Sequence, residues 1–252
     1  MSPAAGPSAL GLLTIEYYTD PLCCWSWALE PHWQRLRAEF GGQLAWRYRL
    51  GGLLRDWGSY RDELNAISRP AQMGPLWLEA KHTTGAAIDA HLWLRDPPAS
   101  SYPACLAVKC AELQSAQAGD VYLHAVRAAA LRDSRNIARP EVLAAVADEL
   151  AAQVPEVFDA AAFHQTMADQ AGVAAFREDL QHARYHQIGR FPTLTIQRGA
   201  GPGVLIVGYR PYEVLVQALR QVAPELVAAR LREEPVETPA AGLAGPPLRV
   251  RS

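Results

Sequence analysis

The chain has 252 residues, of which half are hydrophobic and a fifth are charged, and its formal net charge is only −2. This profile is typical of a globular protein that buries a substantial core in one large domain, or in one domain with an insertion. The near-neutral charge gives no electrostatic reason to expect nucleic acid or a membrane surface as a partner, and no stretch reaches the roughly 18 apolar residues of a membrane-spanning helix.

The cysteine content and the first residues of the chain bear on its compartment. Four cysteines in 252 residues do not make a disulfide scaffold. Residues 1–11 are small and rich in Pro and Gly, with no basic region and no long apolar run, so we expect them to be disordered and not to act as a secretory signal. The expected location is the reducing cytoplasm, where a cysteine acts through its reactivity and not as a permanent bridge.

Residues 12–55 predict a strand, a helix and a second strand. Residues 13–18 are rich in β-branched and aromatic side chains, which is typical of a buried strand. Apolar residues then recur every three or four positions from 25 to 40, which predicts a helix that a pair of glycines ends. Residues 43–50 alternate apolar and polar side chains, as a half-buried strand does. Together these elements form a βαβ unit.

Residues 56–187 are predicted to be almost entirely helical. Helix-like spacing or an Ala-rich composition marks seven segments, at 61–68, 73–83, 105–117, 121–132, 140–153, 161–167 and 173–186. The breaks between them are expected at prolines and at Gly119.

Residues 188–231 predict a hairpin and a helix. Strand character returns at 193–196 and at 204–207, on either side of a Gly-rich turn. Pro211 then opens a helix that runs to about Arg230, since a proline near the first helical position loses no hydrogen bond.

The order of the predicted elements indicates the fold. The two halves, βαβ and ββα, combine into an α/β fold in which two helices flank a four-stranded sheet. This is the thioredoxin fold, with residues 56–187 as a large all-helical insertion between the halves. Residues 232–252, rich in Pro and Ala, are expected to form a flexible tail.

Cys23 is the strongest candidate for chemistry, because it lies between the first predicted strand and the first predicted helix. A thiolate there faces unpaired backbone N–H groups and the positive end of the helix dipole. Such positions lower the pKa of a cysteine from about 8.5 into the range of roughly 3.5–7.5. The alternative is a buried structural cysteine, and placement alone does not decide between the two.

The segment Phe191-Pro192-Thr193 is the second candidate, directly before the first strand of the hairpin. In the inferred fold this loop faces the N-terminus of the first helix. A cis proline there exposes neighbouring backbone groups to an extended substrate, whereas the alternative is an ordinary edge-strand start. The sequence does not tell whether the bond is cis.

Four segments together resemble the DsbA-like thioredoxin superfamily. Residues 20–31, which contain Asp-Pro-Leu-Cys-Cys-Trp-Ser-Trp, resemble its active-site segment, and residues 189–194 resemble its cis-Pro loop. Residues 100–104 and 208–213 resemble further parts of the same group. The similarity spans about residues 12–230 and is strongest to the FrnE-like branch and to the DsbA-like adaptors of Gram-positive bacteria that present a redox regulator to the ClpXP protease.

One departure from the family pattern concerns the second cysteine of its Cys-x-x-Cys motif. Cys23 takes the place of the nucleophile, but Ser26 takes the place of the resolving cysteine. A hydroxyl donates a hydrogen bond to the thiolate but does not displace it from a mixed disulfide. Glutathione or another external thiol would then resolve the adduct. The alternative, resolution by Cys24, requires a strained ring between adjacent residues.

The resemblance implies a thiol-disulfide oxidoreductase or isomerase without a resident cofactor, with glutathione or another thiol as co-substrate. In this hypothesis Cys23 attacks a disulfide, Ser26 stabilises the thiolate, and Cys24 and Pro192 complete the catalytic segment. The substrate surface would include Trp25, Phe191, Thr193 and Ser101, the last because glutathione-using relatives contact the tripeptide near this point. The alternative for Ser100 and Ser101, directly before a predicted helix, is a helix cap, which the sequence favours over the binding role.

Two other functions remain open. The first is a redox-inactive adaptor that binds a protein partner on the same scaffold, which Ser26 favours. The second is a kappa-type glutathione-linked transferase or isomerase, although that group has a serine at the position of Cys23. The expected partners are a disulfide- or thiol-containing protein or a small thiol, and not nucleic acid or a membrane.

Two further clusters admit a structural and a functional interpretation. Cys105 and Cys110 are five residues apart, which favours two small buried side chains over a secondary thiol site. His182 and His186 share a helical face with Glu178, but no established metal-binding pattern accompanies them, so we expect no metal site.

Overall fold

The computed structural model describes residues 13–233 of the chain. Strand β1 (Leu13–Thr19) is the second of four in a sheet of order β2-β1-β3-β4. It runs parallel to β2 (Leu44–Leu50) and antiparallel to β3 (Thr193–Arg198), which pairs in turn with β4 (Gly203–Val207). The predicted combination of a βαβ and a ββα half into one thioredoxin-type sheet is therefore confirmed.

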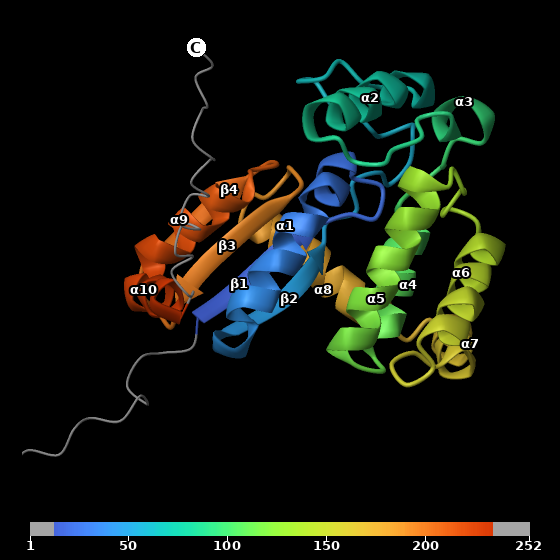
Figure 1. Ribbon diagram of the computed structural model, residues 1–252. Helices are drawn as coiled ribbons and strands as arrows, with labels where there is room; N and C mark the ends of the chain where they lie inside the picture. The colour runs from blue at the N-terminus through green and yellow to red at the C-terminus, as the bar shows by residue number, and fades with distance from the viewer. Residues whose placement is uncertain (1–12, 234–252) are drawn as a thin grey trace, which may run out of the picture.

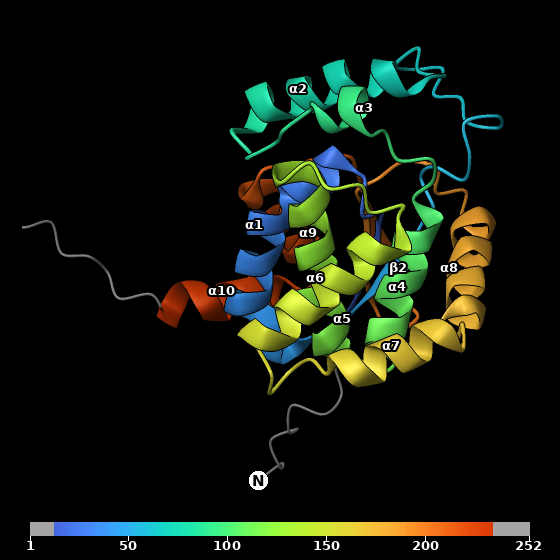
Figure 2. The ribbon, with the colours of Figure 1, turned by 90° about the vertical axis from the view of Figure 1, so that its right-hand side faces the viewer.

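Helices surround this sheet, and most of them belong to the stretch of sequence that connects β2 to β3 (Figures 1 and 2). They are α1 (Cys24–Phe40), α2 (Met73–Thr84), α3 (Leu92–Arg95), α4 (Tyr102–Glu112), α5 (Ala116–Arg127), a π-helical turn (Ala128–Arg132), α6 (Pro140–Gln153), α7 (Ala160–Ala168), α8 (Val173–Tyr185), α9 (Tyr212–Val222) and α10 (Pro224–Glu233), with 3₁₀ turns at Gly41–Gln43 and Pro70–Gln72. In Figure 1, α2 and α3 lie over the N-terminal end of α1, and α4 to α7 pack beside the sheet. Residues 1–11 and residues 234–252 of the expected tail lie outside the described part of the chain, whereas residues 232 and 233, where that tail was expected to begin, belong to α10.

The two faces of the sheet pack against different helices, because successive side chains of a strand point to opposite faces. Tyr17 faces α1, where its ring centroid lies 5.4 Å from that of Trp33. Its neighbour Tyr18 faces α8, where its hydroxyl lies 2.8 Å from His182 Nδ1. Consequently α1 stands on one face and α8 on the other, with α9 packing on β3 and β4.

The predicted helix at residues 61–68 is wrong, because this segment forms a tight turn. The N–H of Asp62 donates a hydrogen bond to the carbonyl of Ile67 at 2.8 Å, and the N–H of Ile67 donates one to the carbonyl of Asp62 at 2.9 Å. The Asp62 carboxylate accepts bonds from the backbone and side chain of Asn65, and Ala66 has a φ of 54°. Asp and Asn side chains compete with helical hydrogen bonds in this way, which the apolar spacing did not reveal.

The predicted helix break at Gly119 is also wrong. The break falls instead before Ser115, whose hydroxyl caps α5 by accepting a bond from Ala118 N at 2.9 Å. Gly119 lies inside α5, and a Cβ there would approach Glu112 Cγ to 2.3 Å. This glycine allows close packing between α4 and α5 and does not end a helix.

The single helix predicted from Pro211 to Arg230 is in fact two helices. Helix α9 ends at Val222 and α10 begins at Pro224, because a proline has no N–H with which to continue the α-helical hydrogen bonds. The short helix α3 and the π-helical turn were not predicted from the sequence.

Three tryptophans are among the largest buried side chains of the core. Trp33 is fully buried, and its Nε1 donates to the Tyr48 hydroxyl at 2.9 Å. Trp77 and Trp93 are also buried, and their ring centroids are 5.2 Å apart in edge-to-face contact, which connects α2 to α3.

No helix within residues 13–233 combines the length and the hydrophobicity that a membrane span requires.

Candidate active site around Cys23

Cys23 caps the N-terminus of α1, directly after the turn that follows β1. Its Sγ accepts a hydrogen bond from the backbone N–H of Ser26 at 3.4 Å and donates one to the carbonyl oxygen of Phe191 at 3.3 Å. The two residues Cys23 and Phe191 are 168 positions apart in the sequence, so the fold brings together the two segments that sequence analysis singled out. Their catalytic roles stay predictions.

The thiol of Cys23 is enclosed, with only 5% of the residue exposed. Burial raises the pKa of this thiol, and the carboxyl of Asp20 acts in the same direction. Three other groups lower this pKa: the hydroxyl of Ser26, the backbone N–H of Ser26 and the charge of Arg127. Their combined effect is smaller than that of burial, so the pKa stays raised. The shift is opposite to the one expected for an open helix N-terminus, because here the sulfur is shielded from water and its proton is bonded to a carbonyl.

Ser26 and Cys24, the other two polar residues in the first turn of α1, have different surroundings. Ser26 is fully buried, and its Oγ has no hydrogen-bond partner of ordinary geometry within residues 13–233, although it lies near enough to lower the pKa of Cys23. The Cys24 thiol points toward the carbonyl of Leu76 in α2, 4.0 Å away, and burial raises its pKa well above the usual range. All four cysteines are free thiols.

The loop before β3 holds Pro192 opposite Cys23. The peptide bond between Phe191 and Pro192 is cis. The Thr193 hydroxyl donates to the carbonyl of Arg190 at 2.7 Å, and the N–H of Gly208 donates to the carbonyl of Pro192 at 2.8 Å. Thr193 itself is buried at the start of β3, so its side chain supports the loop from inside.

Trp25 contributes to a partly exposed aromatic surface beside the site. Its ring centroid lies 6.2 Å from that of Tyr209, and the Tyr209 hydroxyl lies 3.0 Å from His32 Nε2. Each of these side chains is partly buried. A surface of this kind suits an apolar peptide or ligand segment.

Ser101 is fully buried and uses its hydroxyl within the protein. It donates to Asp20 Oδ2 at 2.8 Å and accepts from the N–H of Leu54 at 3.1 Å. Ser101 is the N-cap residue of α4, but its side chain makes no capping bond, and the hydroxyl of the neighbouring Ser100 accepts the bond from Tyr102 N at 3.1 Å. In this arrangement Ser101 positions the loop around Asp20.

Asp20, three residues before Cys23, was not predicted to belong to the site, and its carboxyl is fully buried there. It accepts hydrogen bonds from the N–H groups of Leu22 and Leu53, at 2.9 and 2.6 Å, and from the thiol of Cys105 at 3.4 Å. Burial raises its pKa. Its position directly after a buried strand was the available signal.

Arg127 was also missed, and it is fully buried at the end of α5. Its guanidinium forms an ion pair with Glu30 of α1 and donates to the hydroxyl of Thr19 at the end of β1. It lies 5.8 Å from the centre of the Tyr17 ring. Nothing in the local sequence distinguishes this arginine from the exposed ones.

The secondary clusters are engaged in structural contacts. Cys105 and Cys110 are both buried, and they face different partners, the carboxyl of Asp20 and the carbonyl of Thr166. Glu178 pairs with Arg49 at 3.0 Å. Within residues 13–233 no group of three or more His, Cys, Asp or Glu side chains is arranged to hold a metal ion.

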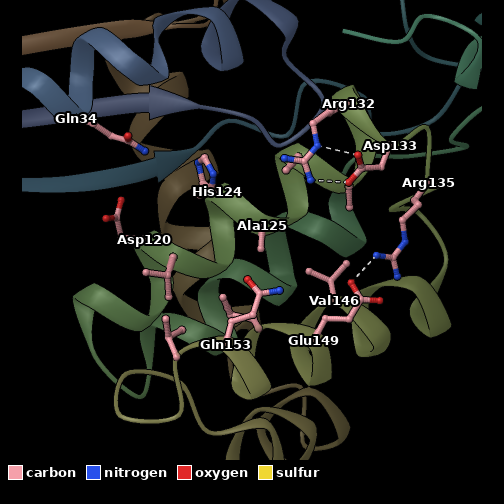
Figure 3. A pocket seen from close by; sticks show the side chains of 15 residues that line it. Gln34, Asp120, His124, Ala125, Arg132, Asp133, Arg135, Val146, Glu149 and Gln153 are labelled. Carbon is pink, nitrogen blue, oxygen red and sulfur yellow. Dashed lines mark hydrogen bonds and ion pairs between the residues drawn. The ribbon is translucent and has the colours of Figure 1, made fainter. Parts of the chain in front are cut away.

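An open pocket of about 360 Å³ lies apart from this site, between α1, α5 and α6 (Figure 3). Its rim carries two ion pairs, between Arg132 and Asp133 and between Arg135 and Glu149. None of the residues predicted to act with Cys23 lines it.

The geometry defines a thioredoxin-fold protein in which one thiol at a helix N-terminus faces a cis-proline loop. Residues 17–217 match the family model described as thioredoxin, and the chain belongs to this family. Among curated proteins, the ClpXP adapter protein SpxH of Halalkalibacterium halodurans is 29% identical over 212 residues, which are 82% of this chain and 67% of the relative.

Solved structures give the same fold. A putative protein disulfide isomerase from Nitrosomonas europaea superimposes with a TM-score of 0.66 at 22% identity, over 88% of this chain and 99% of the other. The cytosolic disulfide reductase DsbM from Pseudomonas aeruginosa gives 0.59 at 23% identity, over 87% and 97%. The predicted DsbA-like thioredoxin fold is thus confirmed.

Proposed function

We propose that this chain is a DsbA-like thiol-disulfide oxidoreductase or isomerase that acts through Cys23. The observation that carries the proposal is the placement of the Cys23 sulfur at the N-terminus of α1, 3.3 Å from the carbonyl that precedes cis-Pro192. Backbone N–H groups at this end of a helix favour the thiolate once the sulfur is uncovered. The carbonyl and the aromatic surface around Trp25 supply contacts for a substrate segment.

The reaction begins when the Cys23 thiol loses its proton and the thiolate attacks a substrate disulfide. A bond forms between Cys23 Sγ and one substrate sulfur, the substrate disulfide breaks, and the second substrate sulfur leaves as a thiolate that takes up a proton. Since position 26 holds a serine, an external thiol then attacks the substrate sulfur of the mixed disulfide and releases Cys23. Glutathione in a reducing cytoplasm is a thiol of this class.

Oxidised glutathione tests this proposal directly. Incubation should attach one glutathione to the wild-type chain, at Cys23, as located by peptide mass spectrometry after trypsin digestion. Cys23→Ser should take up none, whereas Cys110→Ser, a change 87 residues away in a buried helix, should behave as wild type. Equal uptake by Cys23→Ser, or no uptake at Cys23 in the wild type, would refute the proposal.

A second candidate function is a protein-binding adaptor of the protease-linked kind. It is supported by the similarity to proteins named ClpXP adapter SpxH and by Ser26, which removes the resolving thiol. Binding to purified ClpXP, measured by biolayer interferometry, separates the two. Undiminished binding by Cys23→Ser favours the adaptor, and no binding by the wild type counts against it.

A further inference from the structure

Gly51, the residue after β2, lies directly against the ring of Phe191. A Cβ added to Gly51 would be 1.8 Å from Phe191 Cζ, 2.3 Å from Cε1 and 2.6 Å from Cε2. Side chains do not approach one another so closely, so the ring occupies the space that any other residue would fill. Gly51 is not among the residues with positive φ. A side chain at position 51 would therefore displace the Phe191 ring, and the constraint is one of space and not of backbone conformation.

The backbone on which the ring rests is fixed to the core. The N–H of Gly51 donates to the carbonyl of Thr19, at the end of β1, at 2.8 Å. The preceding residue, Leu50, donates its N–H to the buried carboxylate of Asp179 at 2.9 Å. Asp179 also pairs with Arg49 and Lys109, at 2.9 and 2.7 Å. Gly51 is thus a rigid support beside the strand that leads to Cys23.

Phe191 connects this support to the thiol. Its ring lies against Gly51, and its carbonyl oxygen accepts a hydrogen bond from the Cys23 thiol at 3.3 Å. A thiol donates this bond only while it is protonated, so the contact stabilises the neutral form. The same loop helps to keep Cys23 at 5% exposure, which also disfavours the thiolate.

We infer that Gly51 is a positioning residue for the reaction of Cys23. Its contact with the Phe191 ring keeps the Phe191 carbonyl on the thiol and holds the site in a closed, protonated state. Reaction then requires that a ligand take over this carbonyl or that the loop move away. The role in catalysis rests on the proposed function, whereas the effect on the thiol is a property of the free protein.

The test is the pH dependence of Cys23 alkylation by iodoacetamide, followed by peptide mass spectrometry. In Gly51→Ala the methyl group displaces the ring and moves the carbonyl away from the sulfur. The alkylation midpoint should fall by about one pH unit, which gives about tenfold faster alkylation at neutral pH. Gly42→Ala, in the turn before β2, is the matched control, because nothing lies within 4 Å of a Cβ there, and its profile should equal that of the wild type.

A second variant keeps the inference testable if Gly51→Ala does not fold. Phe191→Ala removes the ring and should shift the profile in the same direction. In that background Gly51→Ala should add no further shift, because the two changes disrupt one contact. An unchanged profile in either single variant, or a full additional shift in the double variant, would overturn the inference. Failure of the wild type to take up glutathione would instead refute the proposed function. The effect of Gly51 on the alkylation of Cys23 could still be measured in that case.

Discussion

Arg127 of α5 and Glu30 of α1 form an ion pair that is buried beneath the segment carrying Cys23. Glu30 also accepts a bond from His124 Nδ1 at 3.0 Å, and Arg127 also donates to Thr19 at the end of β1. The helical region between β2 and β3 therefore supplies a cation that connects the active-site helix with the strand before it. Such a pair stabilises the site only while both partners are present.

Replacement of Arg127 by Met should lower the free energy of unfolding by about 3–5 kcal/mol, because it leaves the Glu30 carboxylate buried without its cation. Urea denaturation measures this change. Arg132→Met is the matched control, since Arg132 pairs with Asp133 at the surface, where its side chain is 54% exposed. The control should cost less than about 1 kcal/mol. Equal losses in both variants would show that the buried pair has no special part in stability.

The Glu30 carboxyl makes the free energy of unfolding depend on pH. Burial alone would raise the pKa of Glu30, but the charge of Arg127 and the hydrogen bond from His124 outweigh it and hold this pKa below its ordinary value of 4.5. A folded-state pKa below the unfolded one stabilises the protein above about pH 4.5, and this contribution is lost as the pH falls through the folded-state pKa. The unfolding free energy of the wild type should therefore exceed that of Glu30→Gln most near neutral pH.

The comparison between wild type and Glu30→Gln removes the contributions of the other carboxyl groups. The difference between the two urea midpoints should shrink as the pH is lowered from about 7 to about 3. A difference that stays constant over this range, or grows in acid, would contradict the lowered pKa.

The restoration of a second cysteine tests what Ser26 does. Ser26 is fully buried in the first turn of α1, its N–H lies 3.4 Å from Cys23 Sγ, and its hydroxyl has no partner of ordinary geometry within residues 13–233. Ser26→Cys should therefore place a thiol beside Cys23 without breaking a side-chain hydrogen bond. After oxidised glutathione, this variant should lose two free thiols and retain no glutathione, because the new thiol at position 26 displaces it from Cys23.

Ser26→Ala serves as the control, because it removes the hydroxyl and adds no thiol. It should retain one glutathione on Cys23, as we expect of the wild type. Mass spectrometry of the intact chain distinguishes the two results. Persistent glutathione on Ser26→Cys would mean that position 26 does not reach the sulfur of Cys23.

The sheet and the meeting of Cys23 with Phe191 followed from the sequence, because strand alternation, helical spacing and the Gly-rich hairpin turn are local patterns. The βαβ and ββα order then placed the two segments at one end of the sheet. Arg127 and Asp20 could not be recognised, since their burial depends on which helices pack against α1 and β1. Gly51 could not be recognised either, because a contact with a ring 140 residues later leaves no local pattern.

A final prediction concerns Gly119, which lies inside helix α5. In α5, a Cβ at Gly119 would meet Glu112 Cγ at 2.3 Å and Glu112 Cα at 3.2 Å. The Glu112 side chain would have to turn away and release Lys109, with which it pairs at 2.7 Å.

Gly119→Ala should therefore destabilise the protein despite the better helix former. Overpacking of this kind costs about 1–3 kcal/mol, which exceeds the gain of up to about 1 kcal/mol from replacing a helical glycine. Thermal denaturation of Gly119→Ala should therefore show a midpoint below that of the wild type. A stabilising Gly119→Ala would mean that α4 and α5 separate easily at this point, and that Gly119 marks no close contact.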